Sequence, residues 1–302
     1  MFFKNVEHVM EMLESANYIA SREIATVIFI AISTDKPVLV EGPAGVGKTE
    51  LAKALSKCMN RQLIRLQCYE GLDEAKALYE WEYAKQLLYT QMVKDRINTV
   101  ISDTTSLSDA IDKIASQEDA FFSERFIQPR PLLQAISSPS PVVLLIDEVD
   151  KSDPEFEAFL LELLSDFQVT IPELGTRKST TIPFVFLTSN NYRDMSDALK
   201  RRCIHLYIDY PTSQREKEIV QRKLPHINEI LLDQIITSIN KIRSMDLKKN
   251  PCVSESIDWA RALIALGVNE LNETHIRETL NVICKYQSDH QTVNHNLGQI
   301  LI

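Results

Sequence analysis

The residues best suited to chemistry lie between positions 42 and 49, where the chain fits the pattern G-x-x-x-x-G-K-[ST] at every fixed position. Glycines in such a loop let consecutive backbone N–H groups surround phosphate oxygens, and the start of the following helix adds positive charge. In this pattern Lys48 reaches the β- and γ-phosphates, and Thr49 places its hydroxyl on Mg²⁺. The residues expected to contact the nucleotide phosphates are Gly42, Pro43, Ala44, Gly45, Val46, Gly47, Lys48, Thr49 and Glu50.

The elements on either side of this loop agree with the pattern. Residues 37–41 form a short apolar run, which predicts a buried strand, and residues 50–57 show the apolar spacing of a helix. Strand, glycine loop and helix are the context that a phosphate-binding loop needs. A glycine turn that binds nothing is the alternative, and this context disfavours it.

Two acids and an asparagine follow apolar runs further along the chain. Asp147 and Glu148 come directly after the run 141–146, which is typical of a parallel strand buried on both faces. There Asp147 can hold Mg²⁺, through water or Thr49, while Glu148 can accept a proton from the water that attacks the γ-phosphorus. Asn190 ends the run 184–190 and can hydrogen-bond that water or a phosphate oxygen, whereas Asn191 can equally be a turn residue.

Two further pairs of residues are candidates for contact with the nucleotide. Arg201 and Arg202 lie between a predicted helix and a predicted strand, where they form either a solvated basic corner or an arginine finger for a neighbour's γ-phosphate. Tyr18 and Ile19 precede the first strand and can pack on an adenine base. Ordinary core contacts explain that apolar pair about equally well.

The chain divides into two regions by pattern. Residues 1–211 predict an α/β nucleotide-binding domain with five parallel strands, and residues 212–302 predict a domain of helices only. An aromatic-rich insertion of mostly helical pattern occupies about 70–130, and a β-hairpin occupies about 168–182. The expected strands are 37–41, 63–67, 141–146, 184–190 and 204–208. In the second domain the expected helices are 213–223, 227–245, 254–266 and 272–287.

Composition narrows the classes of protein that fit. The 302 residues are 44% hydrophobic and 25% charged, as in ordinary globular proteins. The net charge of −9 argues against a nucleic acid as the main partner, because binding phosphates requires an excess of Lys and Arg. The five scattered cysteines indicate reduced thiols in a cytoplasmic protein and neither a disulfide framework nor a zinc site. The longest apolar run, residues 25–32, is too short to span a membrane.

Taken together, these motifs resemble an AAA+ ATPase in their order along the chain. The hairpin, the insertion and the segments 169–175, 188–190, 198–203 and 258–263 are more narrowly similar to the MoxR branch. The similarity is to members encoded beside the maturation genes of molybdenum-containing carbon-monoxide dehydrogenases. The resemblance covers roughly residues 17–270.

The resemblance assigns a role to each matching residue. It implies that Lys48 and Thr49 bind phosphate and magnesium, that Asp147 organises the metal, that Glu148 is the catalytic base and that Asn190 positions water. It makes Arg202 the favoured finger, although Cys203 stands where the family usually has phenylalanine, which leaves Arg201 as a substitute. Glu255 takes the place of the sensor arginine in the helical domain, and Arg261 is a doubtful replacement, near the opposite face of its helix.

The family also implies partners and cofactors. These are ATP with Mg²⁺, a hexameric ring with ATP bound between subunits, an adaptor with a von Willebrand A-type domain, and a client protein into which a metal cofactor is inserted. Three other functions stay open at this point. They are a P-loop phosphotransferase, a nucleic-acid-handling AAA+ motor and a nucleotide switch with little turnover. The Asp147–Glu148 pair disfavours the first, the acidic balance the second and the presence of Glu148 the third.

Overall fold

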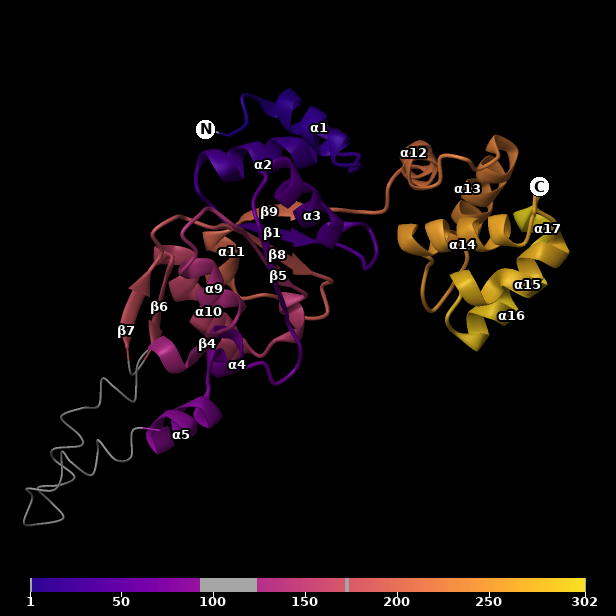
Figure 1. Cartoon of the computed structure of the whole chain (residues 1–302). Helices are drawn as coiled ribbons and strands as arrows, with labels where there is room; N and C mark the ends of the chain where they lie inside the picture. The colour runs from indigo at the N-terminus through magenta and orange to yellow at the C-terminus, as the bar shows by residue number, and fades with distance from the viewer. Residues whose placement is uncertain (1, 93–123, 172–173, 302) are drawn as a thin grey trace, which may run out of the picture.

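A computed structural model describes residues 2–92, 124–171 and 174–301. Its centre is a five-stranded sheet with the strand order β2-β5-β8-β1-β9, in which every neighbouring pair is parallel (Figure 1). The strands are β1 (Val38–Glu41), β2 (Leu63–Gln67), β5 (Val143–Asp147), β8 (Phe184–Ser189) and β9 (Ile204–Tyr207). The predicted α/β class and the five parallel strands are confirmed.

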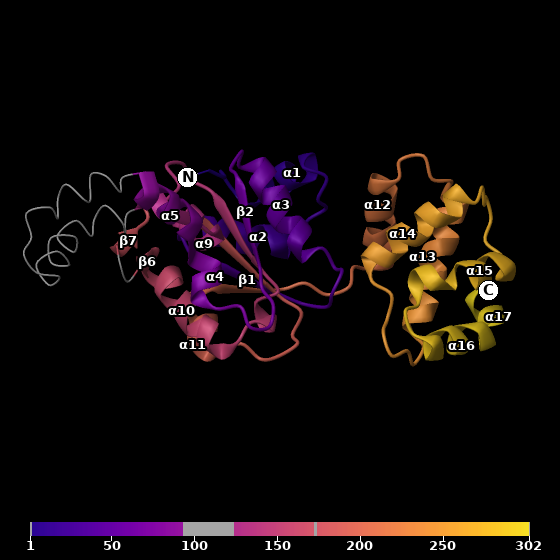
Figure 2. The same ribbon diagram turned by 60° about the horizontal axis from the view of Figure 1, so that its bottom comes forward.

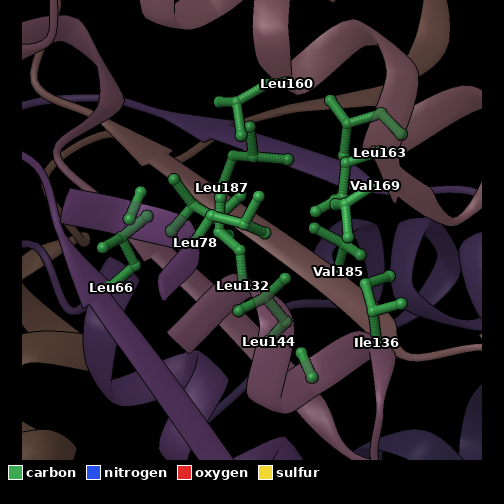
Figure 3. Close-up of a cluster of buried hydrophobic side chains, with 14 of the residues drawn as sticks. Leu66, Leu78, Leu132, Ile136, Leu144, Leu160, Leu163, Val169, Val185 and Leu187 are labelled. Atoms are coloured by element: carbon green, nitrogen blue, oxygen red, sulfur yellow. The ribbon is translucent and has the colours of Figure 1, made fainter. Parts of the chain in front are cut away.

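Helices cover both faces of this sheet (Figures 1 and 2). One face packs against α1 (Val6–Ser15), α2 (Arg22–Ser33) and α3 (Lys48–Cys58), and the other against α4 (Glu74–Leu78), α9 (Pro131–Ile136), α10 (Pro154–Asp166) and α11 (Asp197–Arg202). Figure 3 shows the second of these cores, in which side chains of α9 and α10 meet those of β5 and β8. Because helices bury both faces, all residues of β5 and β8 are buried, which explains their continuous apolar sequence.

The insertion is less helical than its pattern predicts. After α4 the chain forms a strand, β3 (Tyr79–Trp81), that pairs antiparallel with β4 (Ile127–Pro129). The mostly helical pattern expected for the insertion is therefore wrong at this point. Two aromatic residues that alternate around Glu80 favour a strand, and both pack against the core beside α9.

Directly after β3, the described part of the insertion returns to helix. Helix α5 (Tyr83–Met92) follows β3, and a short 3₁₀ turn, Glu124–Phe126, precedes β4. The ring of Tyr89 meets that of Phe126 edge to face, with 5.4 Å between centroids. Residues 93–123 of the predicted insertion lie outside the described residues.

The hairpin is present but shorter than predicted. Its strands are β6 (Gln168–Ile171) and β7 (Gly175–Lys178), and Ile171 pairs with Gly175. The hairpin was expected to extend to about residue 182, and its second strand ends four residues earlier, at Lys178. The reason is the turn: Gly175 adopts a φ of +75°, which lets the chain reverse before it and not after it. Pro172 and Glu173, at the tip, lie outside the described residues.

After β9 an extended segment leads to a group of helices, and the described residues of this region contain no strand (Figure 1). The helices are α12 (Ser213–Lys223), α13 (Glu229–Arg243), α14 (Val253–Ala265), α15 (Glu273–Ile283), α16 (Gln287–His295) and α17 (Leu297–Ile300). The single helix expected over 272–287 is wrong, because Cys284 is extended and ends α15. The group has an apolar core of its own around Trp259, which supports the proposed division near Pro211. Within the described residues, no helix is both long and apolar enough to cross a membrane.

Candidate nucleotide-binding site

The glycine loop follows β1 and runs directly into α3, and two of its glycines are required by close contacts. At Gly42, with a φ of +146°, a Cβ atom would lie 2.0 Å from the carbonyl oxygen of Ile208, just beyond β9. At Gly45, with a φ of +75°, a Cβ atom would lie 2.1 Å from Sγ of Cys252, which precedes α14. The loop is therefore packed between the sheet edge and the helical group, where only glycine fits at these two positions.

Lys48 turns its ammonium group back over the loop. Its Nζ donates to the carbonyl oxygens of Gly42 and Pro43, at 2.6 and 2.7 Å, and to Oδ1 of Asn190 at 2.8 Å. Burial lowers the pKa of Lys48 to about 8, although nearby carboxylates act in the opposite direction. Two donors of the ammonium group thus bond to the loop that is expected to hold phosphate, and the third bonds to Asn190.

Asp147 lies at the carboxyl end of β5, against the first turn of α3. Its Oδ1 accepts hydrogen bonds from the hydroxyls of Thr49, at 3.0 Å, and Thr188, at 2.5 Å. A carboxylate and a hydroxyl are the hard oxygen ligands that Mg²⁺ prefers. Thr49 and Asp147 therefore fit a magnesium ion in their chemistry and in their proximity.

Glu148 follows in a left-handed backbone conformation, with a φ of +56°, which turns its side chain out of the strand. Its Oε2 accepts from Nε2 of Gln67 at 2.9 Å and pairs with Nζ of Lys151 at 2.6 Å. Its Oε1 accepts from Nδ2 of Asn190 at 3.2 Å. Asn190 thus joins Glu148 to Lys48 through the two ends of one side-chain amide.

The loop after β8 is held in place by a buried acid. Oδ2 of Asp150 accepts from the backbone N–H groups of Asn190, at 3.0 Å, and Tyr192, at 2.9 Å. Between them Asn191 adopts a φ of +59°, so it is the turn residue that the sequence allowed. This arrangement fixes the side chain of Asn190 above the loop.

A cavity of about 550 Å³ opens beside the loop, between the α/β part and the helical group. Tyr18 and Ile19, the two candidates for base contact, both line it, together with Val46, Gly47 and Glu50 of the loop region. Further lining residues come from the segment after β9 and from α12 and α14, among them Tyr210, Arg215, Val253 and Ile257. Nη2 of Arg215 donates to the carbonyl oxygen of Ile19 at 2.7 Å and so links α12 to the α/β part.

Arg201 and Arg202 lie at the end of α11, and neither contacts the glycine loop or lines the cavity among the described residues. Arg202 is engaged within its own chain, donating to Oγ of Ser165 at 2.5 Å and to the carbonyl oxygen of Ala198 at 3.0 Å. Arg201 is exposed and has no hydrogen-bond or ion-pair partner in the described part of the chain. The structure therefore does not bring the arginine pair together with the other candidate residues of the same chain.

Neither candidate in the helical group contacts the site as a sensor arginine would. Oε2 of Glu255 caps α14 by accepting from the backbone N–H of Cys252 at 2.7 Å, and its other oxygen pairs with Lys249. Arg261 is exposed, pairs with Asp258 and does not line the cavity. Two arginines of another helix, Arg215 and Arg222 of α12, line the cavity and contact the α/β part, at the carbonyl oxygen of Ile19 and at Glu14.

Sequence reasoning missed several residues of the site, most of all Arg65 and Gln67 on β2. Arg65 reaches Oδ2 of Asp147 with Nε at 3.0 Å and Nη2 at 2.6 Å, and Gln67 holds Glu148. The signal was present, because these two polar residues alternate in an otherwise apolar strand and so share one face. Their position at the carboxyl end of a parallel strand points to the same edge as Asp147.

Comparison with known proteins identifies the family of this domain. Residues 37–203, more than half of the chain, match the AAA domain family, dynein-related subfamily. An uncharacterized protein of Staphylococcus saprophyticus is 26% identical over 240 residues, which cover 77% of each chain. A mitochondrial Lon protease homolog of Yarrowia lipolytica is 23% identical over 251 residues, 78% of this chain and 19% of that protein. A mutant RuvB of Thermotoga maritima superposes with a TM-score of 0.50 at 15% identity, covering 92% of this chain and 72% of that one, which speaks for a shared fold alone.

Proposed function

Because this chain belongs to the AAA domain family, in its dynein-related subfamily, we propose that it hydrolyses ATP and uses that reaction to remodel a partner protein. One observation carries the proposal of hydrolysis. The amide of Asn190 joins the loop lysine, Lys48, to the acid that follows the third predicted strand, Glu148. A site that only bound nucleotide would need the lysine but not the acid and the amide beside it.

The proposed chemistry assigns one task to each of these groups. Lys48 would exchange its contacts with the carbonyl oxygens of Gly42 and Pro43 for phosphate oxygens. Thr49 and Asp147 would hold Mg²⁺, which when bound neutralises charge on the β- and γ-phosphates. Glu148 would take a proton from the attacking water. Asn190, whose amide already bonds to both Lys48 and Glu148, would orient that water.

Proteins with AAA domains usually form oligomers, and we propose that this chain forms a ring, specifically a hexamer. The position of the arginine pair supports this proposal, since a finger that does not reach its own site can serve the site of a neighbour. Native mass spectrometry with and without ATP measures the subunit number directly. A monomer at micromolar concentration with ATP bound would contradict the proposal.

The finer proposal is a MoxR-type chaperone with an A-domain adaptor and a metalloenzyme client. It rests on the sequence similarity of the hairpin and the insertion, and on the positions of β6–β7 and β3–β4 outside the five-stranded sheet. Affinity capture of the E148Q variant with ATP, which should hold clients longest, followed by mass spectrometry, tests it. Recovery of an A-domain protein is the supporting result, and recovery of nucleic acid without protein is the contradicting one.

The direct test of hydrolysis is the Glu148→Gln variant. Removal of the base should lower phosphate release by about a thousandfold, while ATP binding stays within a few-fold of the wild type, because the loop and Lys48 are unchanged. Phosphate release and binding of a fluorescent ATP analogue are the two measurements. Unchanged phosphate release in the variant would remove Glu148 from its proposed role.

A further inference from the structure

Arg65 occupies a position that the proposed reaction does not explain. It lies on β2, the edge strand of the sheet, and its guanidinium group donates twice to one carboxylate oxygen, Oδ2 of Asp147. The Asp147 side chain is 3% exposed, whereas that of Arg65 is 48% exposed. A buried carboxylate without a counterion is costly, and the guanidinium group supplies one.

The guanidinium group of Arg65 pairs with the same carboxylate that is expected to hold magnesium. The hydroxyl of Thr49 lies 3.0 Å from Oδ1 of Asp147 and 3.3 Å from Oδ2, so Thr49 and Arg65 meet at the same carboxylate and share Oδ2. A divalent cation arriving beside Asp147 would lie within a few ångströms of the guanidinium charge. Repulsion between them favours withdrawal of Arg65, and its long, half-exposed side chain has solvent to move into.

The same guanidinium group is also linked to Glu148, the proposed catalytic base, through the side chain of Gln67. Nη2 of Arg65 donates to Oε1 of Gln67 at 2.5 Å, and Nε2 of Gln67 donates to Oε2 of Glu148 at 2.9 Å. Gln67 is therefore oriented by Arg65 so that its amide donor faces Glu148. Gln67 and Lys151 both bond to Oε2 of Glu148, so this arrangement holds the carboxylate in one orientation.

We infer that Arg65 is a metal-displaced latch: it neutralises Asp147 before Mg²⁺ and nucleotide bind, and it holds Glu148 through Gln67 until the metal displaces it. The inference rests on the proposed hydrolysis of ATP and makes Arg65 a positioning residue. It links the presence of the metal to the freedom of the base. Hydrolysis would then begin only when both magnesium and nucleotide are in place.

The test compares metal affinity with and without the charge of Arg65. Mn²⁺, which electron paramagnetic resonance detects, is titrated into the full-length protein with bound ADP, so no turnover is needed. Arg65→Gln should lower the Mn²⁺ dissociation constant about tenfold, because the competing charge is gone. Arg65→Lys, which keeps the charge, should stay near the wild type. Arg61→Gln, the same change at an arginine two residues before β2 begins, is the matched control and should leave the Mn²⁺ dissociation constant unchanged.

The other possible outcomes distinguish a failure of the proposed function from a failure of the latch. Absence of Mn²⁺ binding in the wild type would contradict the proposed function itself. Equal or weaker Mn²⁺ binding in Arg65→Gln would overturn the latch, and Arg65 would then only orient Asp147. The link to Glu148 is checked by the magnesium concentration for half-maximal phosphate release, which should fall in Arg65→Gln in parallel with the binding constant. A fall in the binding constant alone would overturn that link.

Discussion

The phosphate end and the base end of the candidate nucleotide site are held by different kinds of interaction. At the phosphate end, Lys48, Asp147, Glu148 and Asn190 bond to one another and to backbone atoms of the α/β part. At the base end, the cavity is lined by apolar, aromatic and charged side chains, among them Tyr18, and those of α12 and α14 come from the helical group. Hydrogen bonds within the α/β part fix the phosphate end, whereas the base end depends on contacts between the α/β part and the helical group, such as that of Arg215 with Ile19.

This difference separates catalysis from affinity. The contacts among the groups of the phosphate end do not depend on the position of the helical group, because these groups belong to α3, to β5 and to the residues that directly follow β5 and β8. The base end exists only while α12 and α14 lie against the loop, with Cys252 in contact with Gly45. Movement of the helical group should therefore change how tightly nucleotide is held more than how the bond is broken.

The largest expected effect tests whether the phosphate end is complete in one chain. We expect Arg201→Ala to lower phosphate release about a thousandfold with ATP binding unchanged, because Arg201 is exposed and without a partner in the described part of the chain. Arg202→Ala should lose stability first, since Arg202 is bonded to Ser165 of its own α10. Phosphate release, ATP binding and the thermal unfolding midpoint of both variants are the measurements.

Mixing experiments decide where the arginine acts. If the finger serves a neighbouring subunit, Arg201→Ala mixed with Lys48→Ala should recover part of the activity, since some sites then combine an intact loop with an intact finger. No recovery at any ratio would mean that each chain completes its own site. Loss of turnover in Arg202→Ala with an unchanged unfolding midpoint would assign the finger to Arg202, as the sequence motif suggests.

The phosphate end could be predicted from sequence because its chemistry fixes residue types at fixed places. The loop pattern, the acids after a buried strand and the amide after the next one each identify a residue without knowledge of its neighbours. Arg65 could not be identified in this way, because the sequence of β2 does not indicate which acidic residue of another strand its guanidinium group will pair with. Its role depends on the register of β2 against β5, which places Gln67 opposite Asp147.

The base end and the insertion were harder to predict for a related reason. Tyr18 and Ile19 were candidates, but Arg215 belongs to a helix almost two hundred residues away and was not. In the insertion, local helical spacing was outweighed by the pairing of Tyr79–Trp81 with Ile127–Pro129, a contact between distant segments. Periodicity describes a single element, and these features arise between elements.

A smaller effect comes from pH and should appear at the phosphate end alone. The pKa of Lys48 in the free protein is about 8, and bound phosphates should raise it, so ATP binding takes up a proton above pH 8. Affinity for ATP should therefore fall about tenfold between pH 7 and pH 9, as the lysine loses its charge. Burial raises the pKa of Cys68 near the site and of Tyr18 in the cavity to about 12, so neither titrates in this range.

Adenosine, which lacks phosphates, is the control for this pH dependence. Its affinity should stay constant from pH 7 to pH 9, because it fills only the base end. Calorimetry in two buffers with different ionisation enthalpies measures the proton uptake directly. An equal pH dependence for ATP and adenosine would place the titrating group outside the phosphate end.

The smallest expected effect concerns Tyr18 at the base end. Its ring lies in the cavity wall beside the loop, with Cε2 3.8 Å from where a Cβ atom of Gly47 would lie. Tyr18→Leu keeps an apolar side chain in the core below but removes the aromatic face, so affinity for both ATP and adenosine should fall about fivefold. Phosphate release at saturating ATP should stay unchanged, because no group of the phosphate end is altered.

Tyr83→Leu, on the exposed side of α5, is the matched control. An unchanged affinity in a variant with an intact unfolding midpoint would make Tyr18 an ordinary core residue, and a fall in turnover at saturation would show that the two ends are coupled.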